Sequence, residues 1–372
     1  MARLGRVMVE ALVLHYGRQE VLRRLAHPFW FQALGCVMGM DWHSSGVTTT
    51  VFGALKRGLA PVERELGLHF CGGKGAESRR TPAEIEALGA RFGLDADRLV
   101  RASKLTAKVD SAAVQDGFEI YMHGFVALDD GAWTVVQQGM NVETQEARRY
   151  HWLSEGLTSF VDTPHSAIDG PPQGVIVNLT DVRARRAREA QVELVSAGPD
   201  QVLGTLRKLR EVEEPAPAPA QLALPHLTMP TSHGIRPDDV LLRRLHGTLA
   251  AAAERGPKDF AELLLTPGVG ARTVEALASV AEVLHGAPYR FSDPARFSFA
   301  HGGKDRYPYP VRLDVYDSTL RVLRLAVDAA KLGNDEKLSA IRELDRQARL
   351  LEANATGPSF EELVEPAQQA RE

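Results

Sequence analysis

Cysteine is scarce in this chain, and so are aromatic residues and long apolar runs. Its 372 residues include only two cysteines, Cys36 and Cys71, which provide neither a disulfide framework nor metal-ligand spacing. No apolar run approaches the roughly 18–20 residues that a membrane-spanning helix needs. Near the start, Glu10 and His15 interrupt the apolar stretch that a secretory signal would require. These absences lead us to expect a cytoplasmic protein.

An excess of positive charge is missing as well. Lys and Arg number 44 against 48 Asp and Glu, which gives a net charge of −4, so any contact with nucleic acid must come from a local basic surface. One basic stretch, residues 183–188, contains four arginines. It is either a solvated helix face or a track for phosphates, and the sequence leaves both interpretations open.

The chain divides at a Pro- and Ala-rich segment. Alternating Pro and Ala after an acidic cluster predicts a semi-rigid spacer over residues 213–234. Residues 1–212 combine helical periodicity with clustered alternating strands, which predicts an α+β domain with an antiparallel sheet. Residues 235–372 have apolar residues at three- and four-residue spacing and predict an all-helical domain. The predicted fold class is therefore α+β.

Two alternating apolar runs in the first domain predict a β-hairpin. They flank Asp129-Asp130-Gly131, and an Asp-Gly pair between such runs is a strong hairpin signal. A two-residue turn at Asp130 and Gly131 would place His123 opposite Gln138. Alternation also places Glu119 on the same face as His123. That face is either exposed to solvent or the floor of a site.

The second interpretation gives a set of candidate catalytic residues. Carboxylates, a histidine and a lysine gathered at a sheet edge suit metal-assisted hydrolysis of a phosphodiester. Asp110 and Asp116 would hold a divalent cation, Mg²⁺ or Mn²⁺. Three histidines in loop-like contexts, His43, His151 and His165, are alternative metal ligands, although their spacing matches no known site. The candidate catalytic residues are Lys108, Asp110, Asp116, Glu119, His123 and Gln138.

The clearest motif lies in the second domain. An apolar helix is followed by Pro-Gly-Val-Gly at residues 267–270 and then by a second periodic helix. Glycines let a phosphate approach the backbone, and the amides at a helix N-terminus attract an anion. Such contacts position a protein on nucleic acid but read no base sequence. The predicted DNA-binding residues are Gly268, Val269, Gly270, Ala271, Arg272, Thr273 and, from a later loop, Lys304.

This segment resembles the helix-hairpin-helix motif of repair glycosylases, ligases and structure-specific nucleases. In the glycosylases, the resemblance implies an aspartate that acts at the sugar, for which Asp314 and Asp317 are candidates. Arg272 stands where bifunctional members carry a nucleophilic lysine, and an arginine cannot form a Schiff base. Lys304, in the Pro-, Gly- and aromatic-rich loop 287–311, is a substitute candidate.

A glycine-rich stretch in the first domain is a further candidate. Gly72, Gly73 and Lys74 follow a short strand and are predicted to cradle a phosphate through backbone amides. The stretch is not a nucleoside-triphosphate loop, because Ala76 stands where Ser or Thr would be needed.

Several strings together resemble a prokaryotic family catalogued only as a domain of unknown function (number 763). They include GMDWHSSGVTT, CGGKG, KVDSAAVQDGFEIYMHGF and ARRYHW, and the similarity extends over nearly the whole chain. This resemblance implies no reaction. The residues therefore predict a DNA-binding protein of the repair or processing kind, a divalent-metal-dependent nuclease being one form. The alternatives are a base-excision glycosylase and a non-catalytic protein that recruits partners to DNA.

Overall fold

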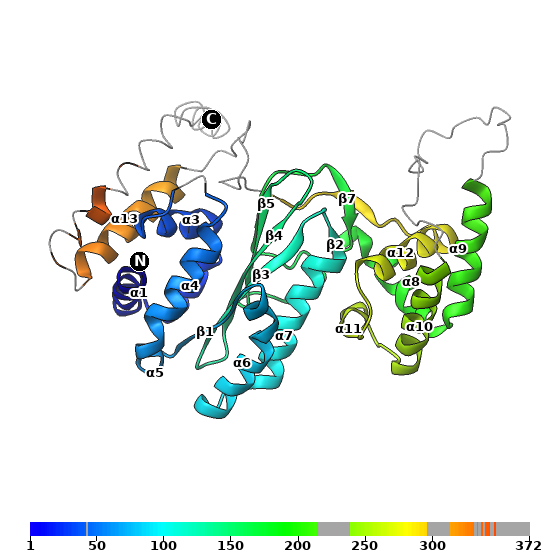
Figure 1. Ribbon diagram of the computed structural model, residues 1–372, viewed down its shortest axis with the longest axis horizontal. Coiled ribbons are helices and arrows are strands. Elements are labelled where there is room, and N and C mark those ends of the chain that lie inside the picture. Colours follow the sequence, from blue (N-terminus) through cyan, green and yellow to red (C-terminus); the bar gives the residue numbers. More distant parts are fainter. Residues whose placement is uncertain are drawn as a thin grey trace, which may run out of the picture.

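The computed structural model describes residues 1–41, 44–213, 239–295 and 313–330, with a few positions between 333 and 346. Figure 1 shows three parts in a row: a helical bundle, a central sheet with two helices, and a helical lobe. None of the described helices is both long enough and apolar enough to cross a membrane.

The helical bundle covers one face of the central sheet. The ten residues of α3 are all buried, because α4, α13 and the sheet pack around this apolar segment. Helix α13 lies far along the chain but packs against α1 and α3 (Figure 1). The elements of the bundle are α1 (Ala2–Tyr16), α2 (Arg18–Leu25), α3 (Pro28–Val37), α4 (Val47–Leu59), η1 (Ala60–Val62), α5 (Glu63–Leu66) and α13 (Leu313–Ala329).

The central sheet is antiparallel throughout, which confirms the predicted α+β class. Its strand order is β1-β3-β4-β5-β6. Met122 and Val136 face the bundle, whereas Phe125, Val135 and Trp152 join a second core beneath α6 and α7. The elements are β1 (Leu68–Lys74), β3 (Glu119–Leu128), β4 (Trp133–Met140), β5 (Ala147–Leu153), β6 (Ala167–Asp169), α6 (Ala76–Phe92) and α7 (Ala96–Lys108).

The β3–β4 hairpin differs from its predicted register by one residue. Its loop has three residues, because Leu128 pairs with Ala132 and Gly131 adopts φ +81°. A left-handed glycine at the end of a three-residue loop is the usual alternative to a two-residue turn. His123 therefore lies opposite Gln137, and Gln138 lies opposite Met122. The predicted pairing of His123 with Gln138 is wrong.

The helical lobe joins elements from both sides of the predicted linker. Helix α12 packs against α8, and β8 pairs with β7 in a small sheet of order β2-β7-β8. The residues before and after 213–234 thus share one core. Of that linker, only Glu213, at the end of α9, is described. The elements are η2 (Val109–Ala113), β2 (Val114–Gln115), β7 (Val175–Asn178), η3 (Val182–Ala184), α8 (Arg185–Ser196), α9 (Pro199–Glu213), α10 (Asp239–Arg255), α11 (Phe260–Leu265), α12 (Ala271–His285) and β8 (Arg290–Ser292).

Gly72 provides a test of how β1 packs. Its φ is +83°, and a Cβ at this position would overlap the carbonyl oxygen of His123 and Oγ1 of Thr81. Gly72→Ala is therefore expected to lower the free energy of unfolding by about 1–3 kcal/mol in a urea titration. Gly204→Ala is the matched control, because Gly204 lies in α9 with open space around it. Alanine at 204 should stabilise the protein by up to about 1 kcal/mol, and equal losses at both positions would contradict this account.

Candidate nucleic-acid interface

The segment around residues 267–270 forms two helices, α11 and α12, joined by a tight turn; we call this unit the helical hairpin. Asp259 caps α11 by accepting a hydrogen bond of 2.7 Å from the Glu262 amide. In the turn, Gly268 has φ +86°, a conformation that favours glycine. Val269 is 1% exposed and packs in the core of the lobe. These local features explain why the sequence pattern located both helices and the turn between them.

The carbonyl groups of the turn are bound by side chains from the centre of the protein. The Lys108 ammonium at the end of α7 donates to the Val269 carbonyl oxygen over 2.5 Å. The Gln115 amide in β2 donates to the Ala271 carbonyl oxygen over 2.9 Å. Desolvation by burial lowers the pKa of Lys108. Lys108 was predicted to be catalytic, but its amine contacts the hairpin backbone.

The start of α12 leaves its amides without a side-chain cap. Gly270 is the N-cap residue and makes no capping bond, so the first-turn N–H groups have no partner within the helix. Of the predicted DNA-binding residues, Gly268 and Arg272 are exposed, whereas Gly270 and Ala271 are half-buried. Thr273 is buried, with 7% of the residue exposed. Lys304 lies outside the described residues.

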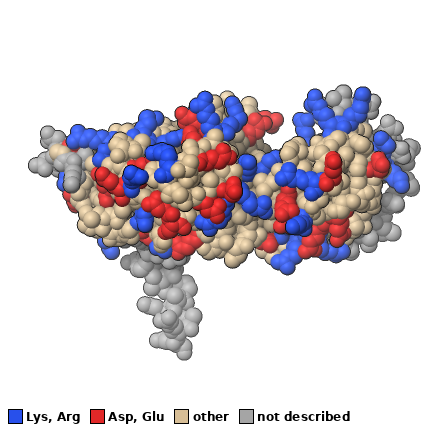
Figure 2. All heavy atoms as spheres, turned by 90° about the horizontal axis from the view of Figure 1, so that it is seen from below, with Lys and Arg blue, Asp and Glu red and all other residues tan. Residues whose placement is uncertain are grey.

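Further cations flank this turn. Gly268 lies beside Thr248 of α10, and Arg244 precedes Thr248 by one helical turn on the same face. On α7, which packs against α11, Arg101 and Lys104 are exposed on the face that leads to Lys108. With Arg272, these exposed side chains form no ion pair with another described residue. Figure 2 shows both signs of charge interspersed over the face seen from below, so this group of cations is a local feature.

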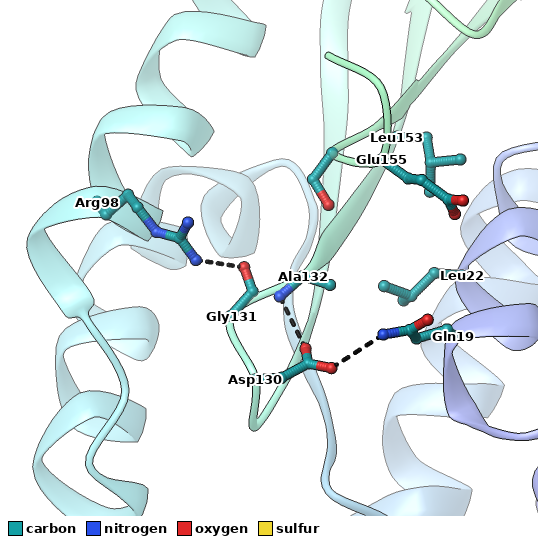
Figure 3. A pocket seen from close by; sticks show the side chains of 9 residues that line it. Gln19, Leu22, Arg98, Asp130, Gly131, Ala132, Leu153 and Glu155 are labelled. Carbon is teal, nitrogen blue, oxygen red and sulfur yellow. Dashed lines mark hydrogen bonds between the residues drawn. The ribbon is translucent and has the colours of Figure 1, made fainter. Parts of the chain in front are cut away.

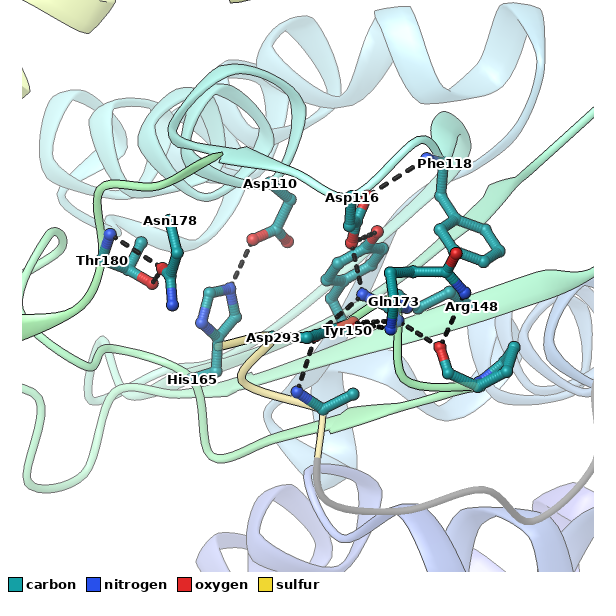
Figure 4. A network of polar contacts seen from close by, with 12 residues as sticks. Asp110, Asp116, Phe118, Arg148, Tyr150, His165, Gln173, Asn178, Thr180 and Asp293 are labelled. Carbon is teal, nitrogen blue, oxygen red and sulfur yellow. Dashed lines mark hydrogen bonds and ion pairs between the residues drawn. The ribbon is translucent and has the colours of Figure 1, made fainter. Parts of the chain in front are cut away.

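Asp110, one of the two predicted metal ligands, lies fully buried in the π-helical turn η2. Its carboxylate accepts hydrogen bonds from Gln137, from Trp152 Nε1 at 2.9 Å and from His165 Nε2 at 2.5 Å. Figure 4 shows His165 pointing at this carboxylate. Both oxygens are thus taken by protein donors. The sequence singled out His165 as an alternative metal ligand, whereas here its Nε2 binds the Asp110 carboxylate, and the sequence missed Gln137.

Asp116, the other predicted ligand, belongs to a separate buried network (Figure 4). Its Oδ2 accepts from Arg148 and from the Tyr150 hydroxyl, each at 2.7 Å. Arg148 also binds Asp293, which follows β8, at 2.6 Å. The Arg148 guanidinium therefore neutralises the negative charge of Asp116 that would attract a metal cation. The two aspartates, as arranged here, do not fit a shared divalent cation, and the described residues contain no cluster of three acidic, His or Cys ligands.

Of the remaining candidate catalytic residues, only His123 is linked to Asp110, because both bind the side chain of Gln137. His123 is buried beneath α7, where Nδ1 lies 2.7 Å from Gln137 Oε1 and Nε2 lies 2.9 Å from Ser103 Oγ. Burial lowers the pKa of His123, so the imidazole is neutral. Gln138 faces the bundle and donates to the Tyr121 hydroxyl at 2.7 Å. Glu119 is exposed at the start of β3. The six predicted residues therefore do not form one site.

Most of the chain matches one protein family. Residues 1–311 match the model of a family described as "Protein of unknown function (DUF763)". The chain belongs to this family. Comparison with curated proteins and with solved structures found no match. The matched region contains the hairpin, the segment 108–115 and both buried networks, and it ends just before α13.

In this member of the family, the glycine-rich stretch is part of a strand. Gly72, Gly73 and Lys74 form the end of β1 and pair with β3. The Gly72 amide donates to the Glu84 carboxylate at 2.7 Å, and Lys56 binds the same carboxylate at 2.8 Å. A carboxylate of the protein therefore already holds this amide, which argues against the predicted phosphate cradle. Lys74 itself is exposed, with Nζ 5.7 Å from the centre of the Tyr121 ring.

A shallow hollow lies at the far end of the β3–β4 hairpin (Figure 3). It has a volume of about 360 Å³ and lies between α2, the start of α7 and the end of β5. Its polar side chains bind protein groups: Gln19 binds Asp130 at 3.2 Å, and Arg98 binds the Gly131 carbonyl at 2.7 Å. None of the predicted site residues lines it. Its polar groups therefore serve to hold the hairpin loop.

Proposed function

We propose that this protein binds the phosphate backbone of DNA through the turn at residues 266–273 and does not read base sequence. One observation carries the proposal: α12 begins without a side-chain cap at the exposed Arg272, and Lys104 and Arg244 each lie one helical turn from a residue beside the turn. These three cations have no anionic partner within the described part of the chain. Helix N-termini bind phosphate through their free N–H groups and their dipole. The resemblance to the helix-hairpin-helix motif supports the same conclusion and favours a role in DNA repair or processing.

The proposal predicts backbone binding with a modest salt dependence. Labelled 20-base-pair duplexes of two unrelated sequences should bind with equal affinity at 50 mM salt, measured by fluorescence anisotropy. Each phosphate contact adds about 0.9 to the slope of log K against log salt concentration. The four exposed cations and the turn together predict a slope of roughly −3 to −4. A strong preference for one sequence, or no binding at low salt, would refute the proposal.

Arg272→Ala tests the interface directly. Losing one phosphate contact should weaken binding about three- to tenfold for every sequence and make the salt slope shallower by about 0.9. Arg3→Ala is the control, because Arg3 is exposed on α1 in the helical bundle, across the sheet from the lobe. Equal losses of affinity in the two variants would show that the effect is one of overall charge and not of the hairpin.

Catalysis stays a prediction. A metal-dependent nuclease would need carboxylates with free oxygens, and Asp110 and Asp116 give theirs to protein donors. For a glycosylase, Asp314 and Asp317 lie in α13, where their side chains are not described. Incubating a damaged duplex with the protein in EDTA, and separately in Mg²⁺ or Mn²⁺, distinguishes the three predicted forms. A nuclease cuts only with metal, a glycosylase leaves an abasic site in EDTA, and a recruiter binds without either product.

A further inference from the structure

Two side chains from outside the hairpin hold its backbone in place. Lys108 Nζ contacts the carbonyl oxygen of Val269, and Gln115 Nε2 contacts the carbonyl oxygen of Ala271. Both side chains come from the segment 108–115, which includes η2 and packs against α12. Gln115 Nε2 also donates to the Ala112 carbonyl at 3.0 Å, so its amide is fixed from both sides.

These two contacts set the direction of the amides that follow. In a trans peptide the C=O group and the next N–H group point in opposite directions. The Val269 carbonyl is bound from the side of the protein body, so the Gly270 N–H must point away from it. The bond from Gln115 fixes the next-but-one peptide in the same way and so orients the Arg272 N–H. The peptide that carries the Gly270 N–H and the peptide that carries the Arg272 N–H are thus each held by a side chain from the segment 108–115.

The chemistry of Lys108 agrees with such a role. Its amine is half-buried, and the Val269 carbonyl is its one hydrogen-bond partner among the described residues. Burying an ammonium group without a carboxylate beside it costs free energy. A methionine could fill the same space without that cost but could not hold the carbonyl. Packing alone therefore does not explain a lysine here, whereas holding the Val269 carbonyl does.

We infer that Lys108 and Gln115 are positioning residues for phosphate binding, which act on the hairpin amides and do not touch the phosphate themselves. This inference rests on the proposed function. In this arrangement the amides are already oriented in the free protein, so DNA binding carries no free-energy cost for ordering them.

The test compares neutral replacements with one that keeps the donor. Lys108→Met and Gln115→Met remove the donors at nearly constant volume, whereas Lys108→Arg retains a donor. In the full chain, each methionine variant should bind the 20-base-pair duplex at least tenfold more weakly at 50 mM salt. The slope of log K against log salt should stay within about 0.3 of the parent value, because no phosphate contact is lost. Lys108→Arg should restore most of the affinity.

Three results would overturn the inference. Affinity could be unchanged in both methionine variants, the slope could become shallower by about 0.9 in Lys108→Met, or Lys108→Arg could bind as weakly as Lys108→Met. The second result would make Lys108 a direct phosphate contact. Urea unfolding of each variant checks the fold, and Gln115→Met carries the test if Lys108→Met is unfolded. Failure of the proposed function is distinguishable, because the parent protein would then not bind at all.

Discussion

Replacing Arg148 with methionine should lower the free energy of unfolding by about 3–5 kcal/mol. The guanidinium is fully buried and binds two buried carboxylates, those of Asp116 and Asp293. Removing the guanidinium leaves both carboxylate charges in the interior without a counter-charge. Keeping unpaired charges buried costs more free energy than losing an ion pair at the surface. Equilibrium unfolding in urea, followed by far-UV circular dichroism, measures the loss.

The matched control is an arginine whose ion pair lies on the surface. Arg183 binds Asp181 at 2.7 Å, but its side chain is 65% exposed. Arg183→Met should therefore cost far less stability than Arg148→Met. If Arg148→Met cost as little as this control, the buried network would not be holding the loop after β8 to the central sheet. Combining Arg148→Met with Asp293→Asn should cost less than the sum of the two single changes, because the second removes one of the unpaired charges.

Acidification should destabilise the protein from pH 6.5 downward, and His151 is a principal cause. This residue is fully buried, where Nε2 accepts a hydrogen bond of 2.9 Å from Arg149 Nε and Nδ1 lies 3.0 Å from the Leu25 carbonyl oxygen. A second ring proton would have to face the guanidinium of Arg149. Burial, together with that neighbouring charge, lowers the pKa of His151 well below 6.5.

The sign follows from the proton count of each state. Below pH 6.5 the unfolded chain binds a proton at His151 and the folded chain does not. The free energy of unfolding therefore has its full contribution from His151 above pH 6.5 and loses it as the pH decreases. At pH 5.0 the loss from this one histidine has an upper limit of about 2 kcal/mol, reached only if the folded protein keeps the imidazole neutral. His123 adds a loss of the same sign.

Urea unfolding at pH 7.5, 6.5, 5.5 and 5.0 measures this dependence. His151→Gln should be less stable than the parent at pH 7.5, but its stability should fall less on the way to pH 5.0, because the buried imidazole no longer has to stay neutral. Parallel pH curves for the parent and His151→Gln would contradict the buried neutral state.

Local sequence signals located most of the elements. The helices on either side of residues 267–270 and the strands around Asp129–Gly131 all lie where periodicity and turn residues put them. Helix α6 is an exception. Thr81 and Pro82 are typical of a helix start, but α6 begins at Ala76 and contains Pro82 in its interior. Pro82 has no N–H for the Ser78 carbonyl, and Thr81 Oγ1 donates to that carbonyl in its place. Element boundaries depend on such small preferences and are the weakest part of a sequence-based prediction.

The roles of the polar residues were much harder to predict. Asp110, Asp116 and His123 have the residue types of a metal or acid–base site, and the sequence gives no way to tell that each is bonded to a buried partner. Their partners, including Arg148 and His165, lie 32 and 55 residues away from the aspartates they bind. A single-residue change in hairpin register also moved Gln138 to the opposite face of the sheet.

The sequence by itself determined the composition class, the antiparallel character of the sheet and the glycine turn between α11 and α12, because these depend on neighbours within a few residues. Tertiary structure alone decided which polar groups remain available. Long-range packing placed Lys108 and Gln115 behind the hairpin and paired the predicted carboxylates with buried donors. Hydrogen bonds between distant segments form only once the chain is folded, so no spacing in the sequence records them.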